Sequence, residues 1–202
     1  MNNVFNQAKI QEYQAKFREH KGSPKSLKWT SHESAVERYR QIVADVDFES
    51  RSVLDVGCGF GDIIPYISAK TQSFEYTGID MVPEFVDLAQ QRYPDYSFQV
   101  GTYFESPLEQ QFDIVLCCGA LNSNMDNPIE YRKQAIATMF SHADVAVVFN
   151  MAGHHPRPKY PETSKVYYAD SQEILEFCYT LTSKVIFRQH YSKKDFTVVL
   201  YR

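Results

Sequence analysis

The 202-residue sequence has no apolar run approaching the roughly 18 residues that a membrane-spanning helix needs. Residues 1–7 contain neither the basic segment nor the apolar core of a signal peptide. Internal repeats and low-complexity segments are also absent. We therefore expect a cytoplasmic protein that does not enter the membrane.

Cysteine is scarce, with four residues, no Cys-x-x-Cys pair and no spacing typical of a metal site. Cys117 and Cys118 are adjacent in an apolar segment, where neighbouring strand residues point to opposite faces. That geometry is poor for a disulfide between them. We expect reduced cysteines that pack as small hydrophobic side chains, and no bound metal ion.

The sequence also has no excess of basic residues. The chain has 21 Lys and Arg against 25 Asp and Glu, a net charge of −4. This balance argues against nucleic acid as a partner, although it leaves room for a local basic patch. With 44% hydrophobic residues, the composition indicates a folded protein, and the length suits one α/β domain.

One glycine-rich segment, VLDVGCGFGD at residues 53–62, is present. An apolar run typical of a buried parallel strand leads into Asp55, and glycine then occupies positions 57, 59 and 61. The nicotinamide or flavin fingerprint Gly-x-Gly-x-x-Gly would require a third glycine at position 62, which is Asp62. The segment therefore predicts a ligand-binding turn of another type.

A second apolar segment ends in Asp80, 25 residues after Asp55. In a βαβ unit, an acid at this position lies beside the first glycine turn and can accept hydrogen bonds from two ribose hydroxyls. A helix cap or a solvated loop residue is the alternative. Together with the glycine turn, Asp80 favours an adenosine-type ligand.

Apolar periodicity predicts alternating strands and helices. Strands are expected at residues 51–56, 75–80, 96–100, 112–118, 144–150, 184–190 and 196–201. Helices are expected at residues 4–20, 62–69, 83–92 and 129–141. Two more helices are expected to begin after the cap residues Ser31 and Ser171, and the second of these runs to residue 181. The short link at 191–195 predicts an antiparallel final pair, and residues 151–166 look like a loop.

The Asp-x-Gly-x-Gly-x-Gly spacing at 55–61, Asp80 and the order of elements resemble class I S-adenosylmethionine-dependent methyltransferases. The resemblance covers residues 31–202. It implies a Rossmann-like α/β fold, with a seven-stranded mixed sheet, one antiparallel strand and helices on both faces. Residues 1–30 would form an N-terminal helical arm or lid.

The resemblance implies S-adenosylmethionine as the cofactor, with Asp55 near its methionine half and Asp80 on its ribose. The family often has an acid after the third strand, near adenine. Here Gly101-Thr102-Tyr103 follows that strand, so backbone groups, Thr102 and aromatic packing would hold adenine. The expected cofactor contacts are Asp55, Gly57, Gly59, Asp80, Met81, Thr102, Tyr103, Gly119 and Asn122.

Candidate acceptor-binding residues follow the fourth and fifth strands, at the sheet edge where open α/β proteins bind ligands. Asn122 can hydrogen-bond a substrate, with a loop cap as the alternative. His154 and His155 are candidate general bases for a hydroxyl or ammonium acceptor. Adjacent histidines in a Pro-rich loop can also be merely solvated, and no further ligands suggest zinc.

Residues 16–28 carry five basic residues against Glu19: Lys16, Arg18, Lys21, Lys25 and Lys28. They form either a solvated helix face or a lid that attracts an anionic acceptor such as a carboxylate. Trp29 would then exclude water, and Tyr168 would form the opposite wall, unless it only packs. The expected substrate contacts are Trp29, Asn122 and Tyr168.

These observations predict methyl transfer to an oxygen or nitrogen atom of a small molecule. One alternative is a catalytically silent module that binds the cofactor and acts as a regulator. The other is a methyltransferase of RNA or protein, against which the acidic balance argues. The sequence leaves the acceptor and the oligomeric state undefined.

Overall fold

The computed structural model describes residues 3–29, 31–161 and 163–202. Helices and strands alternate through most of the chain, at bounds close to those predicted. In chain order the elements are α1 Asn3–His20, η1 Pro24–Leu27, α2 His32–Val43, β1 Arg51–Val56, α3 Ile64–Ser68, β2 Phe74–Asp80, α4 Pro83–Arg92, β3 Ser97–Val100, β4 Phe112–Cys118, η2 Ala120–Asn122, α5 Pro128–His142, β5 Ala143–His154, β6 Ala169–Asp170, α6 Ser171–Leu181, β7 Val185–Arg188 and β8 Asp195–Tyr201.

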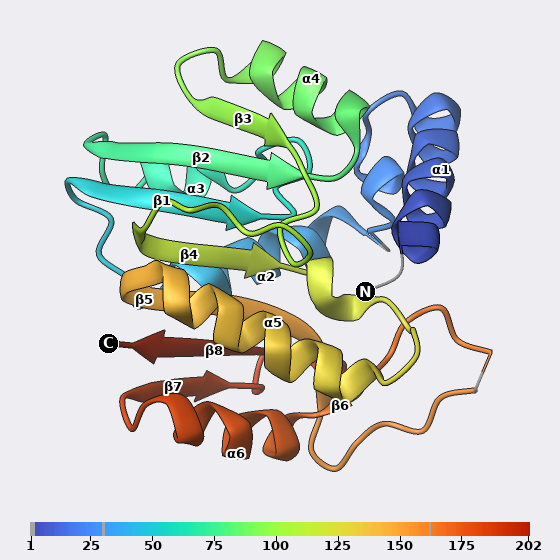
Figure 1. Cartoon of the computed structure of the whole chain (residues 1–202), viewed down its shortest axis with the longest axis vertical. Helices are drawn as coiled ribbons and strands as arrows, with labels where there is room; N and C mark the ends of the chain where they lie inside the picture. Colours follow the sequence, from blue (N-terminus) through green and yellow to red (C-terminus); the bar gives the residue numbers. More distant parts are fainter. Residues whose placement is uncertain (1–2, 30, 162) are drawn as a thin grey trace.

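Seven strands form a continuous sheet in the order β3-β2-β1-β4-β5-β8-β7 (Figure 1). Strands β1 to β5 pair in parallel, and β8 lies antiparallel between β5 and β7. The two-residue β6 adds a parallel pairing to the end of β5. The expected mixed sheet with one antiparallel strand is confirmed.

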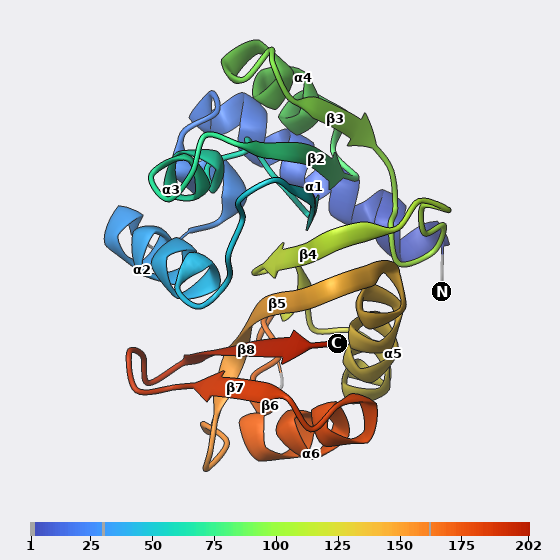
Figure 2. The same ribbon diagram turned by 90° about the vertical axis from the view of Figure 1, so that its left-hand side faces the viewer.

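Helices cover both faces of the sheet because successive strand residues point to opposite sides. Leu54 and Val115 belong to one buried cluster, which includes side chains of α5 and α6. Their neighbours Val53 and Ile114 belong to the other cluster, with α2 and α3. Figure 2 shows α2 and α3 on one side of the sheet and α5 on the other. The sheet is therefore buried on both faces and its strand ends are held rigidly.

Strand β5 is four residues longer at its carboxyl end than predicted, because β8 pairs with it as far as Ala152 and β6 pairs with Gly153 and His154. The loop expected over 151–166 therefore begins only after His154, and its residue 162 lies outside the described part. The cap of α6 is also corrected. Asp170, not Ser171, accepts a hydrogen bond from the Gln172 N–H at 3.0 Å.

Helix α1 crosses the carboxyl ends of the parallel strands, and this position places it over the glycine turn (Figure 1). Tyr13 and Phe17 pack against Phe85 with ring centroids 5.7 and 6.0 Å away, and Phe17 also contacts Phe60. Residues 1, 2 and 30 of the predicted arm lie outside the described part. Among the described residues, no helix has both the length and the apolar character to cross a membrane.

Candidate functional site

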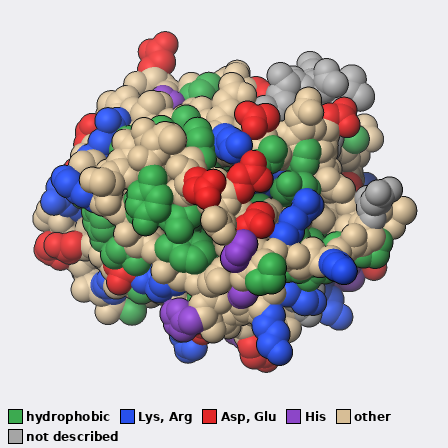
Figure 3. All heavy atoms as spheres, turned by 90° about the horizontal axis from the view of Figure 1, so that it is seen from below, with side chains coloured by type: hydrophobic (Ala, Val, Ile, Leu, Met, Phe, Trp, Pro, Cys, Tyr) green, Lys and Arg blue, Asp and Glu red, His purple; other side chains and the backbone are tan. Residues whose placement is uncertain are grey.

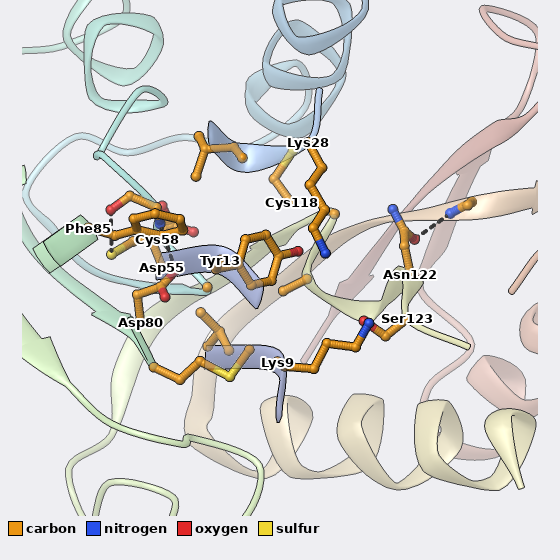
Figure 4. A pocket seen from close by; sticks show the side chains of 18 of the residues that line it. Lys9, Tyr13, Lys28, Asp55, Cys58, Asp80, Phe85, Cys118, Asn122 and Ser123 are labelled. Carbon is orange, nitrogen blue, oxygen red and sulfur yellow. Dashed lines mark hydrogen bonds between the residues drawn. The ribbon is translucent and has the colours of Figure 1, made fainter. Parts of the chain in front are cut away.

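A cavity of about 510 Å³ opens at the carboxyl ends of the parallel strands, beneath α1 (Figure 4). Its volume falls within the range of small-molecule pockets. The glycine turn, the ends of β2, β4 and β5, the arm and the β7–β8 hairpin all contribute to its lining. All the residues expected to contact cofactor or acceptor line it, except the two histidines.

The glycine turn requires glycine for backbone and packing reasons. Gly57 and Gly59 have φ values of +74° and +55°, in the left-handed region that other residues rarely adopt. A Cβ atom on Gly57 would lie 2.5 Å from that of Ala120, and one on Gly59 would lie 3.1 Å from Leu27 Cδ2. The turn is thus held between η2 and the arm, with no room for side chains.

Asp80 connects this turn to the end of β2. Its Oδ2 accepts from the Gly59 N–H at 3.0 Å, and its Oδ1 accepts from the Val82 N–H at 2.9 Å. Burial raises the pKa of Asp80 to about 6, against the lowering effect of hydrogen bonds from Val82, Gly59 and Met81. These hydrogen bonds fix the Asp80 side chain at the cavity wall. The same bonds hold the backbone of the glycine turn in place.

Asp55 is only 3% exposed and supplies a second carboxylate to the same end of the cavity. The Tyr76 hydroxyl donates to its Oδ2 at 2.7 Å. Burial raises the pKa of Asp55 to about 7; the Tyr76 hydrogen bond lowers it and the charge of Asp80 raises it further. Two acids held at this end favour a ligand group that carries positive charge.

The loop after β3 forms the next part of the wall through Thr102 and Tyr103. The Tyr103 hydroxyl lies 2.6 Å from His142 Nδ1, which directs it at α5. Glu105 also lines the cavity. An acid was sought only directly after β3. Glu105 was not predicted, because it lies five residues beyond Val100.

Asn122 holds the loop after β4 and also lies at the cavity wall. Its Oδ1 accepts from the Ala152 N–H at 2.7 Å, and its backbone oxygen accepts from the Tyr167 N–H at 3.0 Å, so it does organise the loop (Figure 4). The residue also lines the cavity. Its amide NH₂ remains as a donor beside Gly119, where a Cβ would lie 3.7 Å from Nδ2.

His154 and His155 do not occur among the described residues that line the cavity. The Nδ1 atom of His154 lies 2.8 Å from the backbone oxygen of His155, and Nδ1 of His155 lies 3.0 Å from an Asp170 oxygen. His154 ends strand β5 and was misplaced in a loop by the sequence analysis. The position of the two histidines outside the described cavity lining gives no support to a catalytic role for either of them.

The arm contributes Trp29 and Lys28 to the lining, whereas Lys16, Arg18, Lys21 and Lys25 are absent from it among the described residues. Trp29 lies against the backbone of Gly119, with Cη2 3.1 Å from the position of a Cβ. Its buried indole N–H has no hydrogen-bond partner within the described part of the chain. Tyr168 lines the cavity, with its ring stacked on Tyr160 at 3.4 Å.

Sequence reasoning missed one charged pair in the wall. The Arg38 guanidinium binds Asp195, with Nη2 2.8 and 2.9 Å from the two carboxylate oxygens, and lies 4.8 Å from the Trp29 ring centre. The two residues are 157 positions apart, and no local pattern links them. Lys9, Tyr13, Lys165 and Lys194 were likewise missed.

Comparison with known proteins gives a consistent result for this chain. Residues 53–144 match the family model described as a methyltransferase domain. The Rv1506c protein of Mycobacterium tuberculosis, which is named as a methyltransferase, is 26% identical over 157 residues, covering 74% of this chain and 92% of that protein. A second relative so named, 235L of Invertebrate iridescent virus 6, is 31% identical over 67 residues, but this chain spans only 25% of its length.

Solved structures share the fold. A DhpI complex with S-adenosylhomocysteine superposes with a TM-score of 0.68 at 15% identity, covering 100% of this chain and 98% of the other. The magnesium protoporphyrin IX methyltransferase of Synechocystis, with bound S-adenosylhomocysteine, gives 0.63 at 18% identity, covering 84% and 82%. Strand order and sequence matches agree, and together they support a class I S-adenosylmethionine-dependent methyltransferase with S-adenosylmethionine as its cofactor.

Proposed function

We propose that this protein transfers the methyl group of S-adenosylmethionine to an oxygen or nitrogen atom of a small molecule. The observation that carries the proposal is a single cavity of about 510 Å³ that joins the glycine turn to a separate wall formed by the arm, η2 and the β8 region. Bound cofactor supplies an electrophilic methyl group. The protein then aligns the acceptor and excludes water, the tasks for which an enclosed cavity is suited.

The residues of the cofactor end fit this ligand. Gly57 and Gly59 let backbone approach it closely, and Asp55 and Asp80 offer acceptors to its ammonium and ribose hydroxyl groups. Thr102 and the backbone around it would hold adenine. These assignments are part of the proposal and rest on the shared cavity lining.

A small-molecule acceptor is favoured over RNA or protein. The net charge is −4, and the face drawn in Figure 3 shows acidic and basic side chains interspersed rather than a basic field. Fold neighbours include methyltransferases named for magnesium protoporphyrin IX and N-acetylserotonin, both small molecules. The cytoplasmic location expected from the sequence stays a prediction.

Two measurements test the proposal. Calorimetry should show binding of S-adenosylmethionine and S-adenosylhomocysteine, but not of NAD. A screen of small-molecule acceptors should release S-adenosylhomocysteine in an acceptor-dependent manner. Tight cofactor binding without turnover on any acceptor would instead support the regulatory module, and strong salt-dependent binding of RNA would support the RNA methyltransferase.

Replacing Asp80 by alanine should weaken binding of S-adenosylhomocysteine by about 1.5–3 kcal/mol, the range for hydrogen bonds to charged groups. The substitution removes the proposed ribose acceptor and leaves the Gly59 N–H without its partner. Calorimetry of the folded variant measures the change. Asp87→Ala, at an exposed position of α4, is the control. An unchanged dissociation constant for Asp80→Ala would remove this residue from the site.

A further inference from the structure

The acceptor side of the cavity concentrates positive charge. Lys28 Nζ lies 2.8 Å from one oxygen of Glu12, and Lys165 Nζ lies 3.0 Å from the other. Lys9 lies 3.5 Å from the same carboxylate. All three lysines line the cavity, although they come from α1, the residue after η1 and the loop before β6. Glu12 is therefore shared by Lys28 and Lys165, so one carboxylate balances two ammonium groups on this side.

The charges are separated along the cavity. Figure 4 shows Asp55 and Asp80 at one end and Asn122 and Ser123 at the other, with Lys9 extending toward Ser123. The positive charge thus lies away from the acids that suit the cationic groups of the cofactor. Asn122, whose amide NH₂ is a donor without charge, adds to the lining on the same side. This environment suits an anion with oxygen atoms.

The described lining offers few candidates for a general base. None of its residues is a histidine. The carboxylates of Asp55, Asp80 and Asp195 are engaged by Tyr76, by backbone N–H groups and by Arg38, respectively, and the remaining carboxylate, Glu105, is an exposed residue of the loop after β3. A hydroxyl or ammonium acceptor has to lose a proton before or during attack, whereas a carboxylate is already ionised at neutral pH.

We propose that the methyl acceptor is an organic carboxylate, held by Lys28, Lys165 and Lys9, and that one of its oxygens is methylated. This inference rests on the proposed function. In the reaction an O–CH₃ bond forms while the S–CH₃ bond breaks, and the electron pair of the broken bond stays on sulfur. The carboxylate loses its negative charge and the sulfonium its positive charge, so no proton is transferred. The products are a methyl ester and S-adenosylhomocysteine.

The chemistry of the product provides the first test. The full chain is incubated with methyl-labelled S-adenosylmethionine and matched sets of probes: benzoate, benzyl alcohol and benzylamine, and octanoate, octanol and octylamine. Mild alkali releases volatile methanol from a methyl ester but not from an ether or an N-methyl group. We expect label in methanol from the acids. Transfer to the alcohols or amines alone would overturn the inference. Phenylphosphonate is included as a further probe, and transfer to it alone would also overturn the inference, because the acceptor would then be an oxyanion other than a carboxylate.

The lysines provide the second test. Lys28→Met keeps most of the aliphatic stem and removes the charge, and Lys165→Met does so on an exposed loop where folding is not at risk. Each should raise KM for the accepted acid about tenfold or more, the effect of losing a charge-assisted hydrogen bond. Calorimetry of the acid with the S-adenosylhomocysteine complex should show the same loss. Lys25→Met, at an exposed lysine within η1, should change neither value.

The outcomes separate the two proposals. Failure of S-adenosylmethionine to bind would end both the proposed function and the inference. Cofactor binding, with none of the acids binding to the S-adenosylhomocysteine complex, would overturn the inference alone. Unchanged KM and affinity in both lysine variants would also overturn it, because the positive charge would then have no part in recognition.

Discussion

Replacing Asp55 by asparagine should make the protein more stable at pH 8 and, at the same time, weaken its binding of S-adenosylmethionine. Burial raises the pKa of Asp55 from 3.8 to about 7, so the folded protein binds more protons than the unfolded chain between these values. The free energy of unfolding therefore falls as the pH rises from 4 to 7, and this loss of stability is complete above pH 7. A shift of this size corresponds to about 4 kcal/mol, the upper limit of the gain expected from asparagine.

Asparagine keeps the packing, since its Oδ1 can still accept from the Tyr76 hydroxyl. Urea unfolding at pH 5 and pH 8 measures the effect, which should be large at pH 8 and small at pH 5. Asp113→Asn is the matched control with the opposite sign. Hydrogen bonds from Ser52 lower the pKa of Asp113, so its loss should destabilise the protein at pH 8.

Binding should respond in the other direction. The ionised Asp55 attracts the cationic end of the cofactor, and a neutral amide does not, so affinity should fall about tenfold or more. For the same reason, the affinity of the unmodified protein should fall as pH decreases from 8 to 6, while Asp55 gains its proton. A variant that is no more stable at pH 8, or that binds as tightly, would contradict this account of the site.

Deleting residues 1–29 should leave the central sheet folded and impair ligand binding. The arm supplies Tyr13 and Leu27 to the cavity wall, and its removal exposes Phe60 and Phe85, which are 1% and 2% exposed. Full exposure of one such side chain costs about 1.5–3 kcal/mol, so stability should fall by several kcal/mol. Loss of the arm should lower the affinity for S-adenosylhomocysteine about tenfold or more, since a lid excludes water and completes the site.

Hydrogen exchange gives the direct measurement. Amides of the arm should become more protected when S-adenosylhomocysteine is added, and those of the sheet should already be protected without it. A double variant, Tyr13→Ala and Phe17→Ala, keeps the full chain length. It should show a smaller loss of affinity for S-adenosylhomocysteine than the deletion does. Equal protection of the arm in both states, with normal affinity in the truncated protein, would show that the arm only packs.

The sequence predicted which residues of the glycine turn and of the end of β2 share one cavity, because its signals there are local. Asp55, the glycines and Asp80 belong to consecutive elements of one βαβ unit. In such a unit, the spacing of residues along the chain determines which of them lie close together. The charged residues on the other side of the cavity were not predicted, because they meet only in the folded sheet. Arg38 meets Asp195, and Lys165 meets Glu12, across most of the chain.

The errors have the same origin. The length of β5 depends on its antiparallel partner β8, whose register could not be derived from either strand alone. His154 and His155 follow a strand at the correct sheet edge, but the local backbone and Asp170 direct them outside the cavity lining. Of the five arm cations, for which a solvated face and a lid were both considered, only Lys28 lines the cavity among the described residues.

The pairing of Arg38 with Asp195 also bears on the order of folding. Contacts between residues 157 positions apart form after local ones, and β8 must enter between β5 and β7 before Asp195 is in place. We therefore expect the binding cavity to be completed late, after the folding transition state. S-adenosylhomocysteine at 100 times its dissociation constant would add about 2.7 kcal/mol to stability. Because the ligand binds only the finished cavity, this gain should slow unfolding and leave the refolding rate unchanged.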